Sequence, residues 1–122
     1  MRLVGQRWHY RIGNSQVDVD HGFSHTLWAQ ERLCINGKTL FVSGGRWRLF
    51  KLWNEPWMTP IDEGLLSVTL RSRLLGMACL VELDGREIEP EALFEATWRA
   101  TPHDWPGDNA WVECHHAAWA PR

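Results

Sequence analysis

Two turn signals set in alternating sequence constrain the fold of this chain more than any other feature. Asn36-Gly37 lies between alternating segments at Glu31–Ile35 and Lys38–Val42. Asp84-Gly85 lies in the same kind of context 48 residues later. Both central residues of a type I′ turn need positive φ, so Asn-Gly and Asp-Gly between alternating apolar residues predict β-hairpins. We therefore expect antiparallel strands.

The sequences around the two turns also match each other. The aligned pairs are Leu33 with Val81, Ile35 with Leu83, Val17 with Leu66 and Val19 with Val68. Each copy reads as a strand, a loop, a strand, an X-Gly turn and a return strand. A unit this short cannot bury its own apolar face. Chance similarity between two hairpins is the alternative, but the pattern predicts two three-strand units packed as sheets face to face.

Further alternation extends this pattern along the first three quarters of the chain. Trp8–Ile12 and Val17–Val19 flank a turn at Gly13-Asn14-Ser15, and Arg46–Leu52 alternates again. This gives about eight strands before residue 90. Pro90 suits the first turn of a helix, and apolar residues between 93 and 98 share one side, so a short helix is expected there.

Length and composition then limit the organisation of the chain. The 122 residues, 44% of them hydrophobic and 23% charged, are typical of one globular domain. We predict an all-β antiparallel sandwich over residues 7–90, followed by a helix and extension over 90–122. Ala110–Trp119 reads as a last strand, which pairs within the chain or with a second copy in a homodimer, or as a segment lying against the domain.

Charge, cysteine content and hydropathy exclude several classes of protein. The net charge of −2 lacks the basic excess that sequence-independent nucleic-acid binding requires. No stretch resembles a signal peptide or reaches the length of a membrane span. The three cysteines are an odd number without C-x-x-C spacing, so no disulfide framework is expected. These features predict a cytoplasmic protein that binds neither nucleic acid nor membranes.

Two stretches of the repeat resemble a known family. Val17–Gly22 followed by Arg32–Lys38, and Ser67–Leu70 followed by Leu80–Arg86, are similar to the two repeat units of the Fas apoptosis inhibitory molecule (FAIM) fold. The resemblance covers roughly residues 7–90 and consists of strands and turns without a catalytic signature. It implies a compact β-sandwich that acts through protein contacts rather than chemistry. The tryptophan excess and the tail beyond Pro90 depart from the pattern, and no functional residue is carried over.

Catalytic and metal-binding patterns are weak. His103, Glu113 and His115 are suitable ligand types for a metal-dependent enzyme, but their spacing favours surface residues. Asp18 and Asp20 alternate on a strand and are expected to be exposed. No serine lies in a nucleophile elbow, and Gly44-Gly45 lacks the rest of a phosphate loop. We therefore expect neither enzymatic activity nor a cofactor.

The nine tryptophans are the remaining unusual feature. Four of them flank prolines, glycines or polar loop residues, where an indole is hard to hide: Trp53, Trp57, Trp105 and Trp111. An exposed indole cluster is typical of a binding surface, so we predict a non-catalytic protein-interaction or regulatory module. A carbohydrate or small-ligand module, in which the rings stack on the ligand, is the alternative. A structural role is the other interpretation: the tail folds back, and the loop tryptophans cover the open end of the sandwich.

Overall fold

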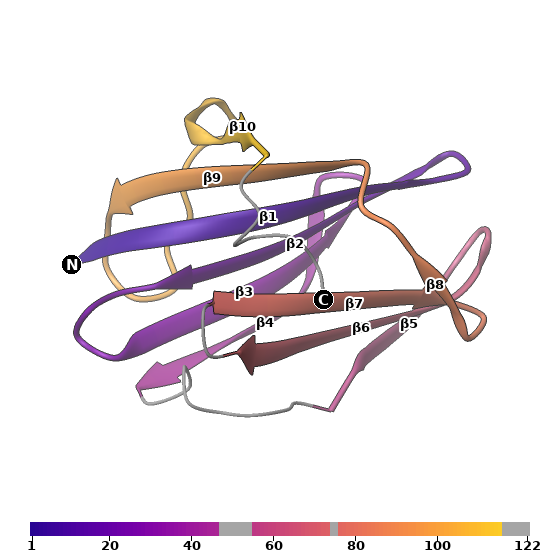
Figure 1. Cartoon of the computed structure of the whole chain (residues 1–122), viewed down its shortest axis with the longest axis horizontal. Coiled ribbons are helices and arrows are strands. Elements are labelled where there is room, and N and C mark those ends of the chain that lie inside the picture. Colours follow the sequence, from indigo (N-terminus) through magenta and orange to yellow (C-terminus); the bar gives the residue numbers. More distant parts are fainter. Residues whose placement is uncertain (47–54, 74–75, 116–122) are drawn as a thin grey trace.

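The structure is a computed structural model that describes residues 1–46, 55–73 and 76–115, and it is all-β as predicted (Figure 1). One sheet consists of β1 (Arg2–Ile12), β2 (Ser15–Phe23), β3 (Trp28–Ile35), β4 (Lys38–Arg46), β9 (Ala92–Arg99) and β10 (Val112–Cys114). The other consists of β5 (Trp57–Ile61), β6 (Gly64–Arg73), β7 (Gly76–Leu83) and β8 (Arg86–Ile88). The six-stranded sheet has the order β10-β9-β1-β2-β3-β4 and the four-stranded sheet the order β5-β6-β7-β8, with every pair antiparallel.

One apolar core joins the two sheets. Trp8 and Tyr10 of β1 belong to the same buried cluster as Leu66 and Cys79 of the second sheet. The Tyr10 hydroxyl donates a hydrogen bond to Cys79 Sγ across the sheets at 3.4 Å. Burial raises the pKa of the Cys79 thiol to about 12, so this thiol stays protonated and behaves as a core residue. The core is built from alternate residues of each strand, as a half-buried sheet requires.

The two three-strand units have the same hydrogen-bond geometry. Asn36 and Asp84 have φ values of 52° and 51°, and the glycine after each has a φ of 82°. The Asn36 backbone N–H donates to the Gln16 carbonyl at 2.7 Å, and the Asp84 N–H donates to the Leu65 carbonyl at 2.9 Å. Both turns are therefore the predicted positive-φ hairpins.

The strand register of the two units also agrees. The pairs in the first unit are Val17 with Ile35 and Val19 with Leu33, and those in the second are Leu66 with Leu83 and Val68 with Val81. The first unit, β2 to β4, lies in the six-stranded sheet, and the second, β6 to β8, lies in the four-stranded sheet. The equivalent apolar pairs of both units meet in the one core between the sheets.

The helix predicted after Pro90 is wrong. Residues Ala92–Arg99 form β9, which pairs with β1 along nearly its whole length. Pairing satisfies backbone groups that β1 would otherwise leave open at the edge of the sheet, and this overrides the local helical pattern. In the described residues the only helical element is the 3-10 turn η2 (Asp108–Ala110). The same residues contain no helix that is long and apolar enough to cross a membrane.

The set of strands differs from the expected one, although eight of those described, β1 to β8, precede residue 90. The sequence does not predict strand β5, because Pro60 lies inside it. The proline is tolerated because β5 is an edge strand of its sheet. The strand predicted over Arg46–Leu52 lies outside the described residues except for Arg46, which ends β4. Strand β10 falls within the stretch Ala110–Trp119 and pairs with β9 of the same chain.

The described part of the C-terminal extension after β9, residues 100–115, packs on the outer face of the six-stranded sheet. There it builds a second apolar cluster around Leu3, Trp98 and Trp111. The Gln30 side chain of β3 holds the extension in place: its Nε2 donates to the Asp104 carbonyl and its Oε1 accepts from the His103 N–H, both at 2.8 Å. The extension is therefore an integral part of the domain.

Candidate functional site

The four edge strands of the two sheets differ in how well they are protected. Strands β8 and β10 have three residues each, and β5 has five residues that include Pro60. Short strands and prolines are the usual means by which proteins block pairing at an edge. Strand β4 has nine residues and no proline, and within the described residues no strand pairs with its outer side. It is the longest edge strand in this part of the molecule.

The side chains of β4 combine an anchored inner face with an exposed outer edge. The Phe41 ring faces inward and stacks on Trp57 with a centroid distance of 5.7 Å and an interplanar angle of 8°. Leu40 and Val42 are 42% and 58% exposed. Leu40 is the extra residue of a β-bulge, because Leu33 lies opposite Phe41 and Cys34 opposite Thr39. The regular segment after the bulge, Phe41–Arg46, is still longer than any other edge strand.

The predicted indole site is divided between two places. Trp57 is the first residue of β5 rather than a loop residue, and its ring closes the side of the sandwich between β4 and β5. Trp105 and Trp111 both contact Trp98, with centroid distances of 5.7 and 5.9 Å. Trp111 is only 8% exposed, so the expectation that this indole is hard to hide is wrong. Trp53 lies outside the described residues, and the role of these indoles in binding stays a prediction.

A buried carboxylate and two arginines lie under Trp105 and Trp111. Asp20 is 0% exposed, which corrects the expectation that it is a solvated strand residue. Its Oδ1 accepts from Arg7 Nε at 2.7 Å, and its Oδ2 accepts from Arg7 Nη2 at 2.9 Å and from Arg32 Nε at 2.7 Å. Burial lowers the pKa of Arg7, but the hydrogen bond and charge of Asp20 outweigh it and raise that pKa above its ordinary value.

The two guanidinium groups are also held by aromatic rings. Arg7 Cζ lies 4.6 Å from the centroid of the Trp111 ring, and Arg32 Cζ lies 4.6 Å from that of the Trp105 ring. Such cation–π contacts fix the plane of each guanidinium. Sequence reasoning missed this arrangement, because the three charged residues come from three strands and only the register brings them side by side.

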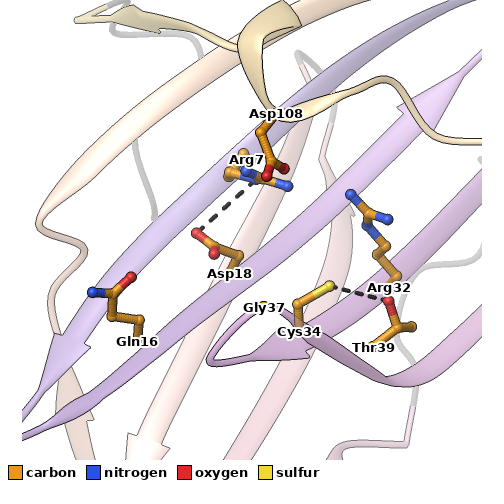
Figure 2. Close-up of a pocket in the computed structure, with 8 residues that line it drawn as sticks. All are labelled: Arg7, Gln16, Asp18, Arg32, Cys34, Gly37, Thr39 and Asp108. Carbon is orange, nitrogen blue, oxygen red and sulfur yellow. Dashed lines mark hydrogen bonds and ion pairs between the residues drawn. The ribbon is translucent and has the colours of Figure 1, made fainter.

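A pocket of about 250 Å³ opens beside these arginines (Figure 2). Its lining comes from four strands, one turn and η2: Arg7, Gln16, Asp18, Arg32, Cys34, Gly37, Thr39 and Asp108. Figure 2 shows Arg7, Asp18 and Asp108 gathered on one side and Arg32 on the other, near Cys34 and Thr39. The Cys34 thiol lies 3.4 Å from the Thr39 hydroxyl, and burial raises its pKa, which disfavours a reactive thiolate.

The weak metal candidates are not assembled into a site. Glu113 and His115, both exposed, approach each other to 3.7 Å, whereas the His103 ring packs edge-on against Trp28 with a centroid distance of 5.1 Å. Among the described residues, no three His, Cys, Asp or Glu side chains are arranged to hold a metal ion. The three cysteines, all within the described part of the chain, form no disulfide, and Cys34 and Cys79 are buried.

Comparison of the chain with protein-family models, with curated proteins and with solved structures finds no significant match. The resemblance of residues 7–90 to the FAIM fold therefore stays a prediction. The free β4 edge and the charged pocket are the two features of the described surface on which a function can be proposed.

Proposed function

We propose that the protein is a non-catalytic, cytoplasmic interaction module that binds an extended segment of another protein as an added strand at β4. The observation that carries this proposal is the contrast among the edges, since β4 alone among the described edge strands is long and free of proline. In strand addition, backbone hydrogen bonds supply affinity and alternate side chains supply specificity. The exposed Val42 and Leu40 offer apolar contacts to such a segment.

The charges of β4 favour a foreign segment over a second copy. Lys38 and Arg46 stand at the two ends of the strand, both exposed, and no acidic residue lies between them. Antiparallel pairing of two copies over the full strand places Lys38 opposite Arg46 at each end. Like charges directly opposite each other destabilise a strand pair. The strand that fits best is therefore extended, apolar at alternate positions and acidic at both ends.

The predicted class of function, a protein-interaction module, is retained here, but the binding surface is strand β4 rather than the indoles. Three of the indoles expected to contact a partner, Trp57, Trp105 and Trp111, have rings that contact Phe41, Trp98 and two arginines of the same chain. Trp57 supports β4 from the inside by stacking on Phe41. The FAIM resemblance implies action of the same kind, through protein contacts rather than chemistry.

Titration calorimetry with a defined probe tests strand addition. The probe is a capped nine-residue peptide in which valine and threonine alternate between two terminal glutamates. Wild-type protein should bind it, and Val42→Lys should weaken binding by about tenfold or more, because it adds a charge to the apolar edge. Leu65→Lys is the matched control: Leu65 is exposed to 43% but lies on β6, between β5 and β7, so its substitution should leave binding unchanged.

Two further measurements separate this proposal from its competitors. A probe with terminal lysines should bind about tenfold more weakly than the glutamate probe, because it repels both ends of β4. Light scattering should find the wild type monomeric. Absence of probe binding, equal binding by Val42→Lys, or a dimer that Val42→Lys dissociates would each contradict the proposal.

A further inference from the structure

We propose that the pocket in Figure 2 binds a small zwitterion of the amino-acid class, with the ligand carboxylate at Arg32 and its ammonium group between Asp18 and Asp108. This site is separate from strand addition at β4, and its test does not depend on that proposal. Three properties of the pocket support it: a pre-oriented cation at one end, two carboxylates at the other and a size that suits a small molecule.

Arg32 forms the positive end of the pocket. Its Nε donates to Asp20 at 2.7 Å, while its two terminal nitrogens form no hydrogen bond with the described residues. Its side chain is only 15% exposed and its plane lies against Trp105. The free N–H groups are thus held in a fixed fork in a partly dry site, which is the geometry that recognises a carboxylate through two parallel hydrogen bonds.

The opposite end of the pocket is negative. Arg7 also lies on this side, where it donates two hydrogen bonds to Asp20, a carboxylate that it shares with Arg32. Asp18 uses Oδ1 for His9 Nδ1 at 2.7 Å, and that oxygen lies 4.0 Å from Arg7 Nε. Asp108, exposed at the start of η2, has no ion pair within the described residues. Two carboxylates on one side of the pocket favour a ligand cation.

Size and shape limit the ligand further. The volume of about 250 Å³ is slightly below the range of about 300–1,000 Å³ for sites that hold drug-sized molecules, so only a smaller ligand fits. Among the residues that the structure describes, no indole lines the pocket, and the Trp105 ring already contacts Arg32 and Trp98. A sugar would therefore find no free ring on which to stack. Gln16 and Thr39 add neutral polar groups to the lining, and the two charged ends fit a molecule that carries both charges itself.

The test begins with the common L-amino acids as probes, screened by thermal shift and then by titration calorimetry. At least one should raise the unfolding temperature and bind, since a ligand of the folded state stabilises it by mass action. N-acetylation or carboxyl amidation of that amino acid should each weaken binding by about tenfold or more, because each removes one charge-assisted contact. Equal binding of the blocked forms, or no binding up to about 10 mM, would overturn the proposal.

Matched variants locate the site. Asp108→Asn alters an exposed carboxylate and should leave the fold intact, yet weaken binding about tenfold. Asp62→Asn, an exposed turn carboxylate far along the chain from the pocket lining, is the control and should change nothing. Arg32→Lys keeps the charge but loses the planar fork, so it should also weaken binding. Unchanged affinity in both pocket variants would place the ligand elsewhere and refute the site.

Discussion

Replacement of Asp20 by asparagine tests the central charge arrangement of the outer face. The Asp20→Asn substitution keeps the shape of the side chain but removes its charge, which leaves Arg7 and Arg32 without this shared counter-ion. Breaking a buried ion pair costs about 3–5 kcal/mol. The Arg7 and Arg32 side chains retain 13% and 15% exposure beside the pocket, so water relieves part of this cost. We therefore expect a loss of about 3 kcal/mol in the free energy of unfolding.

Urea denaturation followed by tryptophan fluorescence measures this loss. The midpoint should fall while the slope against urea stays unchanged, because the variant retains the same fold. Asp62→Asn, which alters an exposed carboxylate, should change the free energy of unfolding by less than about 0.5 kcal/mol. A loss below about 1 kcal/mol for Asp20→Asn would refute the reasoning, since that is the range of a solvated surface pair.

Three other perturbations probe separate parts of the fold. Gly5→Ala should cost about 1–3 kcal/mol in thermal unfolding, because a Cβ at Gly5 would lie 2.6 Å from the Trp98 ring. The hydrogen bond from the Ser15 hydroxyl lowers the pKa of Glu63, so the folded state binds its proton less readily than the unfolded state. Glu63→Gln should therefore destabilise the protein at neutral pH, and its difference from wild type should fade as the pH falls below about 4.5, the ordinary value. A thiol reagent at pH 8 should leave Cys79 unmodified until the protein unfolds, because its pKa is raised to about 12 and its side chain is buried.

Local sequence was sufficient for the hairpins of the repeat. Asn36-Gly37 and Asp84-Gly85 need positive φ whatever surrounds them, and alternation on each side of a two-residue turn sets the register. The pairs that flank these turns, Ile35 with Lys38 and Leu83 with Arg86, follow directly from them. The need to bury two equivalent apolar faces then leads to two sheets around one core.

Contacts between residues that are distant in sequence could not be predicted from local sequence patterns. Ala92–Arg99 has helix-compatible spacing, but the open edge of β1 pairs with it across more than eighty residues of chain. The functional candidates depend on the same kind of contact. Asp20 reads as an exposed residue of one strand until β1 and β3 place Arg7 and Arg32 on either side of it.

The sequence by itself determined an all-β chain with two equivalent hairpin units, because turn chemistry and period-two alternation act within a few residues. Only the tertiary structure decided where the tryptophans lie, which edge stays open and how a pocket with two charged ends forms. Those features arise where strands β1 to β4 and the extension meet, and cross-strand neighbours are set by the register of the assembled sheet rather than by any one segment. Of the tryptophans predicted to form a binding surface, Trp57, Trp105 and Trp111 pack on Phe41, Trp98 and the two arginines.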